Sequence, residues 1–79
     1  MRITFSNNID KVLEFVRACE GFPEDIDVVA GRYVVDGKSI LGVAGICTNK
    51  DLDATINTDD MDRWVAFRIA MTPFLLEEN

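Results

Sequence analysis

The chain has 79 residues, a length that suits one domain spanning residues 1–79. Hydrophobic residues make up 48% of it and charged residues 28%, which is typical of a folded protein and excludes a disordered tail. The net charge of −6 argues against binding of nucleic acid, which requires clustered Lys and Arg. The apolar runs are too short for a membrane helix or a signal peptide, so we expect a cytoplasmic protein without membrane contact.

The cysteine and histidine content argues against redox or metal chemistry. Cys19 and Cys47 are too few for a disulfide framework, and the chain has no histidine to act as a second ligand or as a base. We interpret both cysteines as buried small hydrophobic residues. No metal and no other cofactor is expected.

The first third of the chain predicts a strand followed by a helix. Apolar and polar residues alternate over residues 1–5, as in a strand with one buried face. The segment Ser6-Asn7-Asn8 offers an asparagine as N-cap, and Gly21 and Pro23 mark the end of the helix that follows. The apolar stripe of this helix is predicted to comprise Ile9, Val12, Leu13, Val16, Cys19 and Phe22.

The middle of the chain predicts a hairpin and a short helix. A second strand starts near Asp25, Gly31 provides a turn, and residues 32–35 form a third strand. The pair Asp36-Gly37 is a strong turn signal. Ser39 can then cap a helix over residues 40–46, whose two glycines make it dependent on packing.

The last third predicts a strand over residues 52–57 and a closing helix capped by Asp59 or Asp60. Pro73 should end or kink this helix near Thr72. The apolar residues assigned to the closing helix are Met61, Trp64, Val65, Phe67 and Ile69. Among the aromatic residues, we expect Phe15, Phe22, Trp64 and Phe67 in the core.

The order of the predicted elements is β-α-β-β-α-β-α. This order favours an α+β open-faced β-sandwich, with a four-stranded antiparallel sheet and the helices on one face. Each strand and each helix then has one apolar face to cover.

One segment resembles a known family. Residues 35–43, Val-Asp-Gly-Lys-Ser-Ile-Leu-Gly-Val, resemble the regulatory-serine segment of the HPr family, the phosphocarriers of the bacterial sugar phosphotransferase system. The resemblance implies the same order of elements over the whole chain. It also implies that Ser39 corresponds to the serine phosphorylated in many members, and that Lys38, Ile40, Leu41 and Ala44 correspond to the partner-binding face.

The chain differs from this family at the positions of the family's reactive residues. Counting without gaps, Asn8 falls near the family's phosphorylated histidine and Asp10 near its arginine. Asparagine cannot carry the phosphoryl group by the same route, and an aspartate would repel that group where an arginine holds it. We therefore expect no catalytic residues and no enzymatic activity.

Two further features have a structural and a functional interpretation. Ser39 is explained either as a helix cap or as a phosphorylation site, since a phosphoserine suits a helix N-terminus. Ile40, Leu41 and Ala44 are explained either by packing of the short helix or by docking of a partner. The carboxylates Asp59, Asp60 and Asp62 lack the pattern of a calcium loop and are better explained as a helix cap.

Two functions therefore remain as hypotheses. The first is a non-catalytic HPr-like regulatory module that binds proteins and is switched at Ser39. Its candidate partners are a serine kinase or a phosphotransferase-related regulator. The alternative is the same scaffold reused as an unrelated protein-interaction domain with no phosphorylation role.

Overall fold

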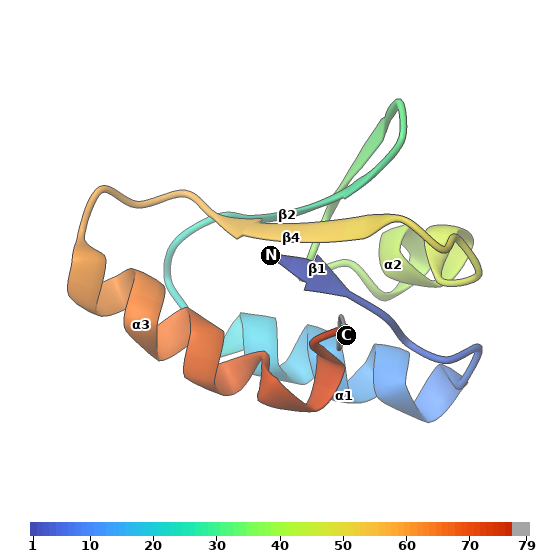
Figure 1. Cartoon of the computed structure of the whole chain (residues 1–79), viewed down its shortest axis with the longest axis horizontal. Coiled ribbons are helices and arrows are strands. Elements are labelled where there is room, and N and C mark those ends of the chain that lie inside the picture. The colour runs from blue at the N-terminus through green and yellow to red at the C-terminus, as the bar shows by residue number, and fades with distance from the viewer. Residues whose placement is uncertain (77–79) are drawn as a thin grey trace.

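The computed structural model describes residues 1–76 and contains the predicted order of elements (Figure 1). The strands are β1 (Arg2–Ile3), β2 (Ile26–Ala30), β3 (Tyr33–Asp36) and β4 (Leu52–Ile56). The helices are α1 (Ile9–Glu20), α2 (Ile40–Ile46) and α3 (Met61–Ala70), followed by the 3-10 turn η1 (Thr72–Phe74). The predicted α+β class and its antiparallel sheet are confirmed.

The four strands form one antiparallel sheet in the order β1-β4-β2-β3. The central pair is β2 and β4, in which Val28 lies opposite Ala54. β3 returns from β2 through a tight turn where Gly31 has a φ of 60°, a conformation that glycine adopts without strain. Among the strands of residues 1–76, β1 pairs with β4 and β3 with β2, so these two strands end the sheet. The outer side of β1 also forms an antiparallel bridge from Ile3 to Leu75, whereas β3 has no such bridge within the described residues.

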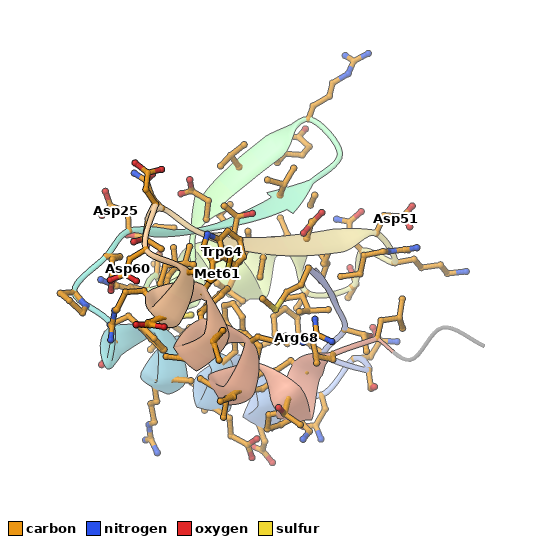
Figure 2. All side chains as sticks on the ribbon, turned by 60° about the vertical axis from the view of Figure 1, so that its left-hand side comes forward. Asp25, Asp51, Asp60, Met61, Trp64 and Arg68 are labelled. Atoms are coloured by element: carbon orange, nitrogen blue, oxygen red, sulfur yellow. The ribbon has the colours of Figure 1, made fainter. Side chains whose placement is uncertain are left out.

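Each helix begins at a polar N-cap, as the sequence indicates. The side chains of Asn8, Ser39 and Asp60 accept hydrogen bonds from backbone N–H groups in the first turns of α1, α2 and α3. The cap is expected to contribute about 1 kcal/mol to each helix. Asp60 thereby confirms the cap interpretation of the acidic cluster that contains it, and Figure 2 shows Asp60 and Met61 at the start of α3.

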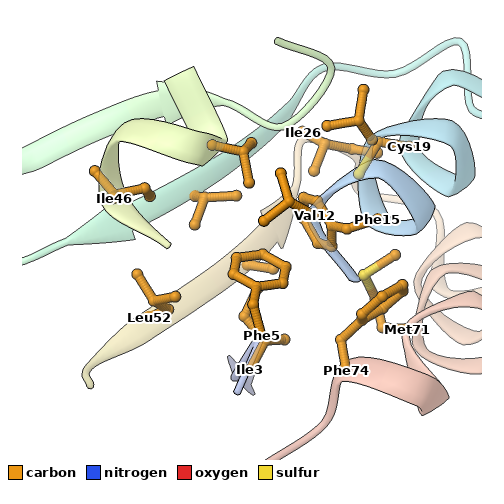
Figure 3. Close-up of a cluster of buried hydrophobic side chains, with 14 of the residues drawn as sticks. Ile3, Phe5, Val12, Phe15, Cys19, Ile26, Ile46, Leu52, Met71 and Phe74 are labelled. Atoms are coloured by element: carbon orange, nitrogen blue, oxygen red, sulfur yellow. The ribbon is translucent and has the colours of Figure 1, made fainter. Parts of the chain in front are cut away.

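The helices cover one face of the sheet, and the core lies between the two layers. Figure 1 shows α1 and α3 along the same side of the sheet. Phe5, Phe15 and Phe74 meet edge to face in this layer, with ring centroids 5.2–6.3 Å apart (Figure 3). Burial of each such side chain stabilises the fold by about 1.5–3 kcal/mol.

The other face of the sheet is not covered by helices. Along β2 and β4 every second residue is buried, and the intervening Asp27, Asp53 and Thr55 are exposed. Asp27 lies directly opposite Asp36 of β3. This face carries Asp27, Asp36 and Asp53, which account for part of the negative net charge, together with the apolar pair Val29 and Val34.

The boundaries and burial differ from the predictions at several positions. The first strand is shorter than predicted, because the ladder that pairs it with β4 covers only Arg2 and Ile3. Phe15 and Phe67 are buried as expected, whereas Phe22 and Trp64 are half-buried and pack against the core from its rim. None of the helices within residues 1–76 is both long and apolar enough to cross a membrane.

The closing helix ends where proline predicts, but not all of its apolar residues are internal. α3 stops at Ala70, and Pro73 lies in the first turn of η1. Met61, Val65 and Ile69 are exposed. Their spacing of four residues places them on the side of α3 opposite the buried Phe67, so the side of α3 that faces the core is narrow.

Candidate functional site

The turn before α2 holds Ser39 in a fixed position. The Asp36 carboxylate accepts the Lys38 N–H at 2.9 Å, and the Asp36 carbonyl accepts the Ser39 N–H at 3.0 Å. The Ser39 hydroxyl oxygen in turn accepts the Gly42 N–H at 3.1 Å. Ser39 is half-buried, so its hydroxyl group already has a structural role as the cap.

Gly37 is required in this turn because its surroundings leave no space for a side chain. A Cβ atom on Gly37 would lie 2.8 Å from Cγ2 of Ile26 and 3.3 Å from Sγ of Cys19. The turn is thus pressed against β2 and the last turn of α1. This contact places the start of α2 beside the end of α1.

The orientation of α2 follows from Gly42. A Cβ atom on Gly42 would meet Cβ of Val35 at 3.3 Å, so this flank of α2 faces β3. Val43 is buried, and Ile40 and Ala44 lie on the flank opposite Gly42. That flank faces α1, with which α2 packs.

The orientation of α1 follows from its aromatic contacts. Phe15 contacts Phe74 of η1, and Phe22, just beyond α1, contacts Phe67 of α3. This flank of α1 therefore faces α3. Ile9 and Leu13 lie on the other flank, toward α2, and both are exposed.

These orientations place exposed or half-buried apolar residues on both sides of the seam between the two helices. The start of α2 lies beside the end of α1, and Figure 1 shows α2 extending from there over the N-terminal half of α1, with which it is in contact. Leu41 is 86% exposed and Ile40 is 49% exposed, while Ala44 is half-buried. We call this surface the α1–α2 strip; it comprises Ile9, Leu13, Ile40, Leu41 and Ala44.

The strip corrects the sequence-based interpretation of α1. The prediction placed Ile9 and Leu13 in the buried stripe of this helix, but the stripe is centred on Val12, Phe15 and Val16. Ile9 and Leu13 are exposed because α2 is too short to cover them. Phe15 indicates this shift in the sequence. It lies three residues after Val12, so the centre of the apolar face moves away from Ile9 and Leu13.

Lys38 lies just before Ser39 and Ile40 in the chain. It is half-buried, and electrostatic interactions link it to Cys19 and to Glu24. Its charge therefore lies toward the end of α1. The positive charge of Lys38 therefore lies on the side of Ser39 that faces the end of α1.

The start of α1 contains a structural asparagine. The Asn8 side chain accepts the Asp10 N–H at 2.9 Å, and the Asn8 N–H donates to the Phe5 carbonyl at 2.9 Å. The tight turn between Phe5 and Asn8 is formed by Ser6 and Asn7, which have φ values of 51° and 56°. Asp10 is exposed in the first turn, where its charge suits the helix dipole.

Cys19 and Glu24 are two groups of the described part of the chain with a clearly shifted pKa. Residues 1–76 contain no cluster of three or more acidic, cysteine or histidine side chains that could hold a metal ion. Cys19 is buried as expected, whereas Cys47 is only half-buried. Burial raises the pKa of the Cys19 thiol to about 12, which keeps it protonated. The hydrogen bond from Arg63 lowers the pKa of Glu24 to about 2, which keeps it ionised.

Comparisons with protein-family models, with curated proteins and with solved structures found no match to this chain.

Proposed function

We propose that this chain is a non-catalytic, HPr-like protein-binding module that docks a partner through the α1–α2 strip. The observation that carries the proposal is the joint exposure of Ile40 and Leu41 directly after Ser39. A leucine that is 86% exposed on a capped helix contributes little to the fold, and adjacent exposed apolar residues often mark protein contacts. The element order and the segment over residues 35–43 agree with what the family resemblance implies.

The absence of catalysis is proposed from the start of α1. Asn8 and Asp10, which fall near the family's histidine and arginine, serve as a helix cap and as an exposed acidic residue. Neither can accept and hold a phosphoryl group as a histidine beside an arginine does. The module would act by binding alone.

Ser39 is the proposed switch of this module. Phosphorylation would add nearly two negative charges at the N-terminus of α2, next to Ile40 and Leu41 and on the side of Lys38. The added charge changes what can dock on the strip. A serine kinase and phosphotransferase-related regulators are the partner classes that fit, and the cytoplasm is the compartment in which such a kinase would act.

Intact mass measured after two incubations tests the phosphorylation part of the proposal. With an HPr-type serine kinase and ATP, the wild-type protein should gain one phosphate, and Ser39→Ala should gain none. With phosphoenolpyruvate and the first phosphotransferase enzyme, neither protein should be labelled. Acid-labile phosphate in the second incubation would contradict the non-catalytic assignment.

Binding to immobilised phosphotransferase enzymes and regulators tests the docking surface. Leu41→Asp should abolish capture while leaving the thermal midpoint nearly unchanged, because Leu41 is exposed. Val65→Asp places the same charge on the exposed side of α3 and serves as the matched control. Equal loss of binding in both variants would exclude the strip as the docking surface.

A second candidate function is an interaction domain without a phosphorylation role. It is favoured by the Ser39 hydroxyl oxygen, which is already engaged with the Gly42 N–H as a cap. Under this alternative, capture of a partner depends on Leu41 but is the same for unmodified and phosphorylated protein.

A further inference from the structure

The edge strand β3 exposes apolar side chains. Tyr33 is 70% exposed and Val34 is 62% exposed, although both belong to a regular strand. Figure 1 shows the β2–β3 hairpin projecting away from the helices. β3, with the sequence Tyr-Val-Val-Asp, has no lysine, proline or bulge to protect its edge, and its one charged residue is Asp36 at the end of the strand.

The hydrogen-bonding pattern shows which backbone groups of β3 point outward. The Gly37 N–H donates to the Ile26 carbonyl at 2.7 Å, which makes this a hydrogen-bonded pair of the antiparallel ladder. Such pairs alternate along the strands, so Tyr33 and Val35 also direct their N–H and C=O groups toward β2. The N–H and C=O groups of Val34 therefore point away from the sheet.

We propose that β3 pairs with β3 of a second copy of this chain, antiparallel about a twofold axis at Val34. The two Val34 residues would exchange N–H to C=O hydrogen bonds across the axis, continuing the sheet through both copies. In this register, Arg32 of one copy lies opposite Asp36 of the other. Tyr33 lies opposite Val35.

Charge complementarity favours a second copy as the occupant of this edge. Within residues 1–76, Arg32 forms no ion pair, and the Asp36 carboxylate accepts a hydrogen bond only from the Lys38 N–H. A directly opposite pair of unlike charges stabilises an antiparallel ladder. The twofold axis creates this pair twice.

The register is restricted by the outward-pointing groups. Of the β3 residues, Val34 and Asp36 have N–H groups that point outward, and Arg32 lies in the turn just before the strand, so antiparallel pairing about the strand brings these three positions opposite one another. An axis at Asp36 would set two carboxylates against each other, and an axis at Arg32 would do the same with two guanidinium groups. Only an axis at Val34 places Arg32 of each copy opposite Asp36 of the other.

The helix side of the same strand is also complementary. Val35 packs beneath α2, against Gly42, and Tyr33 lies on the same side of the sheet. Across the axis, Tyr33 would cover Val35 of the second copy. Pairing thus covers Tyr33 on the helix side, while the two Val34 side chains lie beside each other on the opposite face of the sheet.

Sedimentation equilibrium over micromolar to millimolar protein tests the dimer. The wild-type mass should rise from 8.9 kDa toward twice that value with concentration. Val34→Lys should remain monomeric, because two ammonium groups would face each other on the axis. Val65→Lys, on the exposed side of α3, should dimerise like the wild-type protein. A wild-type protein that stays monomeric, or a dimer lost in Val65→Lys but kept in Val34→Lys, would overturn the proposal.

A charge exchange tests the register. Arg32→Asp should abolish the dimer, and the double variant Arg32→Asp with Asp36→Arg should restore it, because the unlike charges are then exchanged in both copies. Circular dichroism establishes that each variant is folded. A folded double variant that remains monomeric, or a dimer unaffected by Arg32→Asp, would overturn the register.

Discussion

The hydroxyl oxygen of Ser39 accepts a hydrogen bond from the backbone N–H of Gly42 at 3.1 Å, and this contact begins α2. A residue with a proposed regulatory role thus also holds the helix that carries the docking residues. Any change at Ser39 therefore has two separable effects, one on stability and one on charge.

Substitutions of Ser39 should separate these effects. Ser39→Ala removes the cap and should lower the free energy of unfolding by about 1 kcal/mol. Ser39→Asp keeps an acceptor at the same position and should lose much less, since aspartate is as good an N-cap as serine. Urea denaturation monitored by circular dichroism measures both. Equal losses in the two variants would argue against the cap as the source of stability.

Alanine at two glycines should have opposite effects. Gly37→Ala places a Cβ atom 2.8 Å from Cγ2 of Ile26 and should cost about 1–3 kcal/mol. Gly45→Ala, inside α2 and with nothing within 4 Å of the new Cβ atom, should stabilise the protein by about 0.5–1 kcal/mol. Thermal unfolding of both variants checks the signs. A neutral Gly37→Ala would show that the turn can shift.

The ion pair of Glu24 and Arg63 should make stability depend on acid pH. Two hydrogen bonds from Arg63, of 2.6 and 3.0 Å, lower the pKa of Glu24 from 4.5 to about 2 in the folded protein. Because the unfolded chain takes up the proton first, the contribution is complete above pH 4.5 and is lost as the pH falls toward about 2. Glu24→Gln should reduce the slope of stability against pH in this window.

Nuclear magnetic resonance titration of the Glu24 carboxyl group provides the direct measurement. In Arg63→Gln, the midpoint should move back toward the ordinary range of a glutamate, because the hydrogen bonds from the guanidinium are absent. An unchanged midpoint would show that another interaction lowers the pKa.

The two cysteines should differ in reactivity. Cys19 is buried and its pKa is raised to about 12, mainly by desolvation, so a thiol reagent at neutral pH should leave it unmodified in the folded protein. Cys47 is only half-buried and should react first. Mass spectrometry after timed alkylation assigns the sites. Modification of Cys19 at the rate of Cys47 would indicate that the end of α1 opens readily.

Local patterns were sufficient to predict the elements of this fold. Alternation predicted the start of β2 and both ends of β4 to within one residue, because one face of each strand is buried and the other is not. The cap Ser39 was predicted correctly, and Asn8 and Asp60 were each one of two adjacent candidates, since capping depends only on a few neighbouring residues. The antiparallel sheet with helices on one face follows from the order of these elements.

The order of the elements follows from local sequence patterns alone. Which apolar residues face solvent depends on how the elements pack against one another. Ile9 and Leu13 fit a buried helical stripe, and Val34 fits a strand, but their exposure depends on the length and position of neighbouring elements. A side chain is buried only if another segment covers it, and that information is not local.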